Sequence, residues 1–309
     1  MLVVLNPAAG GGTALARWEA IVPELRAAAG TFRTVAANDC QEAHASIASA
    51  LEAGETVFVA AGGDGTVNLV LACLVELAGD GLPRLTLGAV GLGSSNDFHK
   101  PIRPHRRIGP IPCRLGASDA RPHDVGLLAW SSEDGHLRWQ PWIVNASIGI
   151  TAEANRFYNE RSGLMERVKR RGTGVAMTWA ALHGLFRAGV TELTVENGSG
   201  SARRFRVRNL GIVKNPHFAG RLRYDSPHDP TSGDFFVHIL GDVGLRRAVT
   251  TLAGLARGRF VGRSGTRSWR ASRLTVSGSA PFAVEMDGEV ITTRSAEFSI
   301  LPQRIRVCG

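Results

Sequence analysis

Residues 62–68 are Gly62-Gly63-Asp64-Gly65-Thr66-Val67-Asn68, placed directly after the apolar run 56–61 and before the apolar segment 69–77. The first run is short and rich in β-branched residues, which predicts a strand, and the second has helical length. Glycines in the turn allow positive φ angles and a close approach of the backbone to a ligand. Because a helix N-terminus offers N–H groups and a positive dipole end, this stretch predicts a phosphate-binding turn.

Asp64 is an unusual residue for a phosphate-binding turn unless a cation accompanies the phosphate. Mg²⁺ in nucleotide sites is commonly held by one or two carboxylates together with phosphate oxygens. Asp64 therefore predicts Mg²⁺ bound with a nucleotide, and a tight strand-to-helix turn with an incidental aspartate is the alternative. The turn matches neither the Gly-x-Gly-x-x-Gly fingerprint nor the Walker A loop.

Residues 1–100 alternate between predicted strands and predicted helices. The alternation predicts an α/β domain with a parallel sheet and helices on both faces. Ligands bind such sheets at the carboxyl ends of the strands, and three polar turns follow strand ends here, so we expect these turns to line one crevice. The predicted strands are 2–5, 32–36, 56–61 and 85–90, and the predicted helices are 14–29 and 41–53.

After residue 123 the pattern changes to short strands separated by turns such as Asn197-Gly198. This pattern predicts a β-sandwich-like second domain with helical insertions, connected through a segment rich in Pro and Arg. We expect domains at 1–123 and 124–299, with residues 300–309 packing back on the first. The predicted strands are 142–148, 192–196, 205–213, 235–239, 273–277, 282–286 and 297–301, the insertions are roughly 152–188 and 244–257, and the connection is 101–122.

Five blocks, in this order, resemble the diacylglycerol-kinase-like lipid kinases, which include bacterial diacylglycerol and phosphatidylglycerol kinases, sphingosine kinases and ceramide kinases. The blocks cover most of the chain. The resemblance implies a domain like that of NAD kinases and diacylglycerol kinases, a β-sandwich-like domain, and phosphoryl transfer from ATP with Mg²⁺ to a lipid hydroxyl. The blocks are Asn6-Pro7-Ala8-Ala9-Gly10, residues 62–68, Gly93-Ser94-Ser95-Asn96-Asp97-Phe98, Asp124-Val125-Gly126 with Asn145-Ala146-Ser147-Ile148-Gly149, and Asp287-Gly288-Glu289.

The resemblance also implies roles for individual residues. Glu289 is the expected proton acceptor, Asp287 is expected to hold the base or the metal, and Asp64 completes the expected catalytic set. Asn96 and Asp97 could instead cap a following helix, and Asp287-Gly288 could be only a hairpin turn. The expected nucleotide-binding residues are Asn6, Pro7, Ala8, Ala9, Gly10, Gly62, Gly63, Asp64, Gly65, Thr66, Val67, Asn68, Ser94, Asn96 and Asp97.

Many bacterial members of this family carry Pro-x-Ala-x-x-x-Asp-Gly, whose aspartate helps to bind a structural Mg²⁺. Residues 227–234 here are Pro-His-Asp-Pro-Thr-Ser-Gly-Asp, so the final pair is inverted. Asp234 could replace the family's aspartate as the Mg²⁺ ligand if the backbone is shifted, and Asp229 lies nearby in the sequence. Asp124 either contributes to this site or anchors the domain junction. The expected metal ligands are therefore Asp64, Asp124 and Asp234.

The composition indicates a basic protein of a reducing compartment. The formal charge of +9 is compatible with nucleic acid, an anionic membrane or a phosphorylated ligand as the partner. The four cysteines form no Cys-x-x-Cys pair, which favours the cytosol over a zinc site or a disulfide scaffold. No stretch is predicted to reach the ~20 apolar residues that span a bilayer.

Both predicted helical insertions have basic ends and apolar stripes, as in helices that lie on anionic lipid. Ordinary core-facing helices with solvated ends are the alternative. In the first insertion these residues are Arg167, Lys169, Arg170, Arg171, Val175, Met177, Trp179, Leu182, Leu185 and Phe186. In the second they are Arg246, Arg247, Val249, Leu252, Ala253, Leu255, Ala256, Arg257 and Arg259.

Together these patterns predict a cytoplasmic, peripherally membrane-associated lipid kinase. Diacylglycerol is the default acceptor, and a sphingoid base, ceramide or phosphatidylglycerol is the near alternative. The expected partners are the lipid substrate and an anionic membrane surface, without nucleic acid, and a homodimer is left open. An NAD kinase-like enzyme shares the glycine turn, but Asp287-Gly288-Glu289 and the basic helices argue against it. A catalytically inactive nucleotide- or membrane-binding regulator is the remaining alternative. The intact carboxylates argue against it, and the inverted Gly233-Asp234 pair keeps it open.

Overall fold

The computed structural model describes residues 1–101, 106–132, 134–159, 165, 167–168, 173–198 and 200–309. It divides into two compact units, Met1–Val125 with Pro302–Gly309, and Gly126–Leu301. Two long strands, β7 (Arg121–Ser131) and β17 (Glu289–Val307), contribute residues to both units. The end of the chain is therefore part of the first unit.

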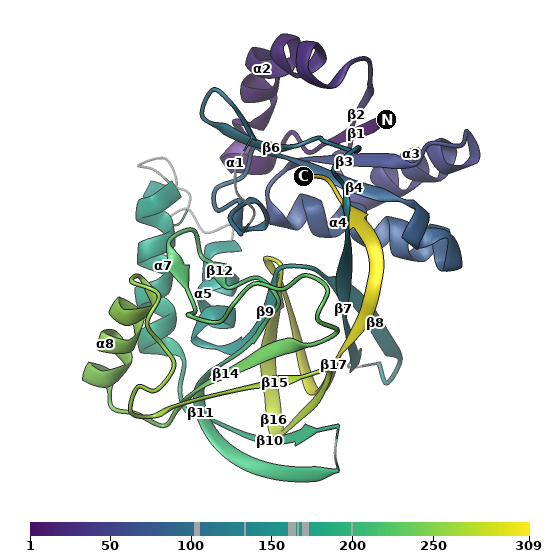
Figure 1. Ribbon diagram of the computed structural model, residues 1–309. Coiled ribbons are helices and arrows are strands. Elements are labelled where there is room, and N and C mark those ends of the chain that lie inside the picture. The colour runs from purple at the N-terminus through teal and green to yellow at the C-terminus, as the bar shows by residue number, and fades with distance from the viewer. Residues whose placement is uncertain (102–105, 133, 160–164, 166, 169–172, 199) are drawn as a thin grey trace. The chain divides into compact units, whose positions relative to one another are not determined.

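The first unit is an α/β domain built on a parallel sheet (Figure 1). The strand order is β2-β1-β3-β4, with parallel pairing throughout, and the last residues of β17 add to β4 in parallel. Nearly every residue of β1, β3 and β4 is buried, because helices and loops cover both faces of such a sheet. The strands are β1 (Leu2–Leu5), β2 (Arg33–Ala36), β3 (Val57–Gly62) and β4 (Thr86–Gly91).

The helices of this unit lie on the two sides of the sheet (Figure 1). The predicted helix α2 (Ala14–Ala29) buries Trp18, Ile21 and Leu25 against one face, and α3 and α4 contact each other and the sheet. Helix α3 begins where Asp39 Oδ1 accepts from the Glu42 N–H at 2.9 Å, which is an N-cap. The other helices are α1 (Ala9–Gly12), α3 (Cys40–Glu52), α4 (Asp64–Ala78), η1 (Gly79–Arg84) and η2 (Asp97–His99).

Helix α4 and the 3-10 turn after it form one apolar segment, Asp64–Arg84, that has the length and hydropathy of a membrane span. The prediction that no stretch has this length is therefore wrong. The segment contacts β3, and Val67, Val70 and Leu74 are buried in the unit. A helix that covers a buried parallel sheet is apolar for this reason, so its hydropathy reflects its place in the core.

Residues 106–114 belong to the first unit and are not a domain connection, in contrast to the prediction for 101–122. Strands β5 (Arg106–Ile108) and β6 (Ile111–Arg114) form a hairpin, and β6 pairs with β4 in antiparallel orientation. Ile111 and Cys113 are buried in the core beside α2. Ile108 packs against the same core, and the other residues of the hairpin are mostly Arg and Pro, so the segment was not predicted as strands.

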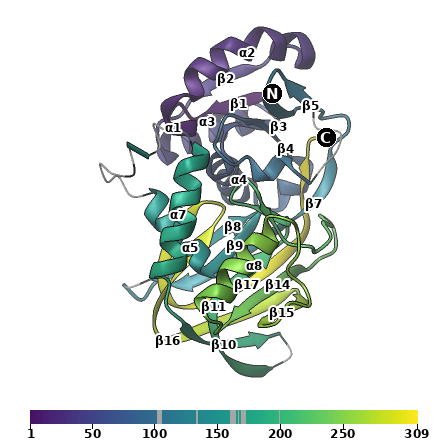
Figure 2. The same cartoon turned by 90° about the vertical axis from the view of Figure 1, so that its left-hand side faces the viewer.

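The second unit is an antiparallel β structure with three described helices packed on it (Figure 2). The main strand order is β15-β14-β11-β10-β16-β17, and β9 pairs with both β11 and β16, end to end with β10. Trp142, Phe235 and Phe298 are among the buried side chains of its core. Its remaining strands are β8 (Leu137–Trp142), β9 (Asn145–Gly149), β10 (Thr191–Asn197), β11 (Ser201–Val213), β12 (His217–Phe218), β13 (Leu222–Arg223), β14 (Phe235–Gly241), β15 (Thr266–Ala271) and β16 (Arg273–Met286).

Three sequence predictions for this unit need revision. The strands predicted at 273–277 and 282–286 are one strand, β16, with a register shift between Ser277 and Phe282. The strand predicted at 142–148 is interrupted at Ile143 and Val144, whose N–H groups bind a side chain described below. Strands β7, β8, β12, β13 and β15 were not predicted, apart from Trp142 at the end of β8. The helical insertions appear as α5 (Ile150–Asn159), α7 (Thr173–Arg187) and α8 (Leu245–Leu255).

His238 on β14 makes the stability of the second unit dependent on pH. It is fully buried, stacks on Tyr224 at 4.2 Å between ring centroids, and its ring nitrogens lie near the hydroxyls of Ser268 and Ser226. Burial lowers the pKa of His238 to about 4. The unfolded chain binds a proton near pH 6.5, whereas the folded protein does not until about pH 4. We therefore expect the free energy of unfolding to fall by up to about 3 kcal/mol as the pH is lowered from 6.5 to 4.

This expectation can be checked by urea unfolding at pH 7.5 and pH 5 for the parent and the His238→Gln variant. The variant should lose less stability than the parent on acidification, because glutamine does not titrate. Equal losses in the two proteins would show that other groups carry the pH dependence.

Candidate functional site

The turns after β1, β3 and β4 lie together at the carboxyl edge of the parallel sheet, as predicted. Asn6 Nδ2, after β1, donates to Thr66 Oγ1 at 3.2 Å. The Leu92 N–H, after β4, donates to Gly62 O at 2.8 Å. The predicted nucleotide-binding residues of the three turns therefore share one edge of one domain.

Glycine is required at three positions where these turns touch. A Cβ atom on Gly93 would lie 2.3 Å from Gly63 Cα, and one on Gly62 would lie 2.2 Å from Thr66 Oγ1. Gly10 has a φ of 61°, and a Cβ there would lie 2.6 Å from Leu92 O. The glycines thus bring the backbones of the turns into direct contact. Gly63 also occupies the N-cap of α4, so no side chain there can bind the first N–H groups of the helix.

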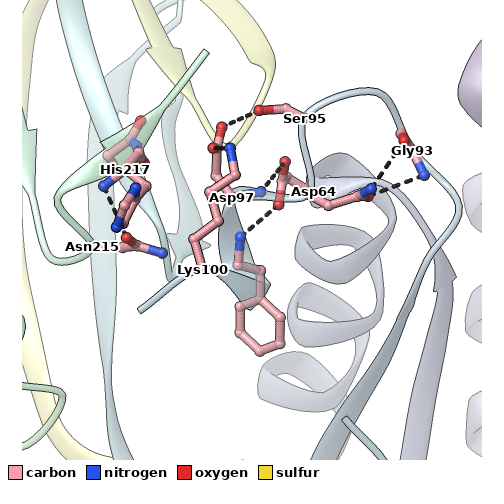
Figure 3. A network of polar contacts seen from close by, with 10 residues as sticks. Asp64, Gly93, Ser95, Asp97, Lys100, Asn215 and His217 are labelled. Carbon is pink, nitrogen blue, oxygen red and sulfur yellow. Dashed lines mark hydrogen bonds and ion pairs between the residues drawn. The ribbon is translucent and has the colours of Figure 1, made fainter. Parts of the chain in front are cut away.

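Asp64 connects the glycine turn to the turn that follows β4 (Figure 3). Its Oδ2 accepts from the Asp97 N–H at 3.0 Å, and its Oδ1 accepts from the Phe98 N–H at 2.9 Å. It also stands in the first turn of α4, where the helix dipole favours a carboxylate. The Asp64 carboxylate therefore fixes the turn after β4 against the start of α4.

Asn96 and Asp97 shape the turn after β4. Asn96 has a φ of 52°, and its amide donates to Gly91 O and Gly93 O and accepts from the Gly93 N–H, at 3.0–3.1 Å. Asn96 precedes η2 but its side chain does not cap it, so the capping alternative is wrong for this residue. Asp97 is buried and accepts from the Ser95 hydroxyl and the Lys100 ammonium (Figure 3). Ser94 is exposed.

Two arginines that the sequence did not single out hold the same edge. Arg17 Nη1, on α2, donates to Leu92 O at 2.7 Å, and burial lowers the pKa of Arg17. Arg114 Nη2, on β6, donates to Phe98 O at 2.8 Å, and burial lowers its pKa to about 10. Arg114 remains cationic at neutral pH, so the turn after β4 carries a buried positive charge at Phe98 O.

Asp287, in the second unit, is a buried carboxylate that orders the backbone between β8 and β9. Its Oδ2 accepts from the Ile143 N–H at 2.8 Å, and its Oδ1 accepts from the N–H groups of Val144 and Asn145 at 3.0 Å. Asp287 and Gly288 have φ angles of 46° and 97° and connect β16 to β17 as a two-residue hairpin turn. Asp287 and Gly288 therefore do form a hairpin turn, and the Asp287 carboxylate also orders the neighbouring backbone.

Two glutamates flank Asp287 in different environments. Glu289, the predicted proton acceptor, is exposed and accepts from Gln140 Nε2 at 2.8 Å. Glu285 is buried, and it accepts from Ser147 Oγ at 2.8 Å and from the Gly288 N–H at 2.9 Å. Glu285 was missed, although a charge inside the apolar run 282–286 was a usable signal.

The other two predicted metal ligands bind protein groups. Asp124 is fully buried, and its Oδ1 accepts from the Gln303 N–H at 2.8 Å, which ties β7 to the returning end of β17. Asp234 pairs with Arg270. Within the described ranges, no group of three or more His, Cys, Asp and Glu side chains could hold a metal ion.

Comparison with known families identifies both parts of the chain. Residues 1–128 match the model of the diacylglycerol kinase catalytic domain. Residues 145–309, more than half of the chain, match the YegS C-terminal NAD kinase beta sandwich-like domain. The chain belongs to the diacylglycerol-kinase-like lipid kinase family. The predicted two-domain fold class of this family is thereby confirmed.

Individual members of the lipid kinase family differ considerably from this chain in sequence. It is 34% identical over 118 residues to the "Probable lipid kinase YegS-like" of Stenotrophomonas maltophilia (strain K279a), and this alignment spans 35% of each protein. Its fold is similar to that of a "putative diacylglycerol kinase" from Bacillus anthracis str. Sterne, with a TM-score of 0.71, 18% identity and coverage of 99% and 96% of the two chains. A diacylglycerol kinase structure from the same organism gives a TM-score of 0.68 and 15% identity, with coverage of 99% and 95%.

Proposed function

We propose that this protein transfers the γ-phosphoryl group of ATP to the hydroxyl group of a lipid, with diacylglycerol as the first candidate. The observation that carries the proposal is the direct contact between the turns of Gly63 and Gly93 beneath the N-terminus of α4. Glycine backbones and a helix start without a side-chain cap leave space and N–H donors for phosphate oxygens. Asn6, which bridges to Thr66, lines the same edge.

Phosphoryl transfer also needs neutralisation of charge on the phosphates. Mg²⁺ supplies this when it is bound with ATP, and Asp64 is the residue that would hold it, because carboxylates are the usual protein ligands of nucleotide-bound Mg²⁺ and Asp64 stands in the first turn of α4. Arg17 and Arg114 add fixed positive charge at the same edge. The family membership and the donor set support this part of the proposal.

For the second unit, we assign proton acceptance to Glu289 and positioning to Asp287. Glu289 is exposed, so its carboxylate is accessible to a substrate hydroxyl. Asp287 precedes it in the hairpin and is fixed by three backbone N–H groups, which hold the turn that carries Glu289. Glu285 supports the same turn through the Gly288 N–H.

We also propose that α7 and α8, which lie side by side (Figure 2), contact an anionic membrane surface. Four side chains on one face of α7 are 41–68% exposed although they are large and apolar, and their spacing of four, three and four residues is helical. On α8, Leu245 and Val249 are also large, apolar and exposed, and the two helices carry exposed basic side chains at Arg187 and Arg246, with Arg257 after α8. The α7 residues are Val175, Trp179, Leu182 and Phe186.

The structure revises which residues of the two helices belong to this surface. Leu185 and Leu255, predicted in the apolar stripes, are buried and face the core. Lys169, Arg170, Arg171 and the side chain of Met177 lie outside the described residues. The apolar face of α7 and the arginines of α8 therefore carry the membrane proposal.

Substitution of Trp179 and Phe186 by serine should weaken binding to vesicles that contain an anionic phospholipid by roughly 10–100-fold, because two half-exposed aromatic side chains lose apolar contact. Vesicle sedimentation measures this directly. The matched control replaces Leu137 and Trp139, which are equally exposed on β8. Equal binding by the parent and the α7 variant, or equal loss in the control, would contradict the assignment of this surface.

The function itself is tested with radiolabelled ATP, Mg²⁺ and a panel of diacylglycerol, sphingosine, ceramide, phosphatidylglycerol and NAD, with the products resolved by chromatography. We expect a labelled lipid. Labelled NADP alone would indicate an NAD kinase-like enzyme, and binding of Mg·ATP without any product would indicate a nucleotide-binding regulator. The proposed lipid kinase would be cytoplasmic and peripherally associated with the membrane.

A further inference from the structure

The resemblance implies a structural Mg²⁺ at the inverted Gly233-Asp234 pair, and the residues there do not fit this ion. Asp234 Oδ2 lies 2.7 Å from Arg270 Nε, and Oδ1 accepts from Arg270 Nη2 at 2.8 Å. Ser232 Oγ donates to the same Oδ1 at 2.7 Å. Both carboxylate oxygens are thus engaged by a bidentate arginine pair, which is a strong and specific geometry for a carboxylate.

A lysine side chain already places a positive charge against the loop 228–234. Lys214 follows β11, and only 3% of its surface is exposed. Its ammonium donates to the backbone oxygen of Asp234 at 2.9 Å and to Ser232 Oγ at 3.0 Å. Burying an ammonium group costs free energy unless oxygens accept its hydrogen bonds. The Asp234 backbone oxygen and Ser232 Oγ accept such bonds here.

Other residues of the loop bind the Lys214 backbone or one another. His228 Nδ1 donates to Lys214 O at 3.2 Å. Asp229 Oδ1 accepts from the N–H and the hydroxyl of Thr231 at 3.0 and 3.2 Å. The Thr231 bonds hold the pKa of Asp229 below its usual range, and the positive charges of Lys214 and Arg270 contribute.

We propose that the Lys214 ammonium is the resident structural cation of residues 228–234, in place of a divalent metal. Mg²⁺ binds oxygen at 2.0–2.1 Å and requires near-octahedral oxygen ligands. An ion at the Asp234 and Ser232 oxygens would stand next to the ammonium nitrogen, and the two positive charges would repel each other. The loop therefore needs no metal to keep its conformation, whether or not the protein phosphorylates a lipid.

The first measurement is thermal unfolding of the nucleotide-free parent protein in excess EDTA and in millimolar MgCl₂. We expect the same Tm in both solutions. A Tm that is lower in EDTA and rises with Mg²⁺ would show a structural divalent site and overturn the proposal. Neither solution contains nucleotide or lipid, so the result is independent of the proposed kinase activity.

The second measurement uses Lys214→Met, which keeps the length of the side chain and removes its charge. Its Tm should fall by about 5–10 °C, because the buried end of the side chain loses two hydrogen bonds and two partly buried acceptors lose their partner. The matched control is Arg273→Met, which removes a charge from an exposed pair with Glu297 and should shift the Tm by about 1 °C or less. Equal shifts in the two variants would contradict the proposal.

A third variant, Lys214→Ala, leaves space for a small ammonium ion. Propylammonium chloride should raise its Tm more than it raises that of the parent, whereas Mg²⁺ should not substitute for it. A variant that is restored by Mg²⁺ and not by the amine would overturn the proposal. If the Lys214 variants do not fold, the comparison of EDTA and MgCl₂ on the parent decides the question.

Discussion

The Gly65→Asp variant should fold like the parent and lose at least about 100-fold of its affinity for Mg·ATP. Gly65 lies exposed in the first turn of α4, where an aspartate is compatible with the helix dipole, so we expect no loss of stability. The new carboxylate would stand next to the proposed phosphate position. Repulsion between unit charges about 5 Å apart amounts to about 3 kcal/mol at an effective dielectric constant of 20, which corresponds to the stated loss.

Isothermal titration calorimetry with Mg·ATP and a thermal melt of the same sample provide the test. Gly65→Asn is the matched control, because it has the same shape without the charge and should lose less affinity than the aspartate. A folded Gly65→Asp variant with the affinity of the parent would remove this turn from nucleotide binding. Equal losses for Asp and Asn would indicate that bulk, not charge, excludes the phosphate.

The parts of the fold that the sequence predicted are those encoded by neighbouring residues. The glycine turn at 62–68 carries its strand, its turn residues and its helix within one short stretch, and β3 and α4 are found there. The contact of the three turns followed from a general property of parallel sheets, whose strands end at a common edge. The hairpin of β5 and β6 was missed, because few of its residues are apolar and Ile111 and Cys113 are buried against a core formed with distant segments.

The candidate site was predicted unevenly for the same reason. Arg17 and Arg114 bind backbone carbonyls 75 and 16 residues away, and no local pattern marks such a bond. The pairing of Asp234 with Arg270 depends on the antiparallel register of β14 and β15, and β15 was not predicted. Motifs singled out Asp64, Asp124 and Asp287 as candidates, whereas the structure shows which backbone N–H groups their carboxylates bind.

The Glu289→Gln variant should lose about 10²–10⁴-fold in kcat and keep the affinity of the parent for Mg·ATP. Glutamine retains the shape of the side chain and can still bond Gln140, but it cannot accept a proton. A positioned general base contributes about this factor. Because Glu289 is exposed at the first residue of β17, its replacement should leave the Tm within about 1 °C of the parent value.

Asp287→Asn distinguishes the positioning residue from the base. An asparagine has one acceptor oxygen and places an NH₂ group against at least one of the N–H donors of Ile143, Val144 and Asn145. The lost bonds are buried, so we expect a loss of about 1–3 kcal/mol in the free energy of unfolding together with lower activity. Glu289→Gln should therefore reduce kcat without reducing stability, and Asp287→Asn should reduce both. A fully active Glu289→Gln enzyme would refute the assignment of the base, and an inactive Asp287→Asn enzyme of unchanged stability would transfer that role to Asp287.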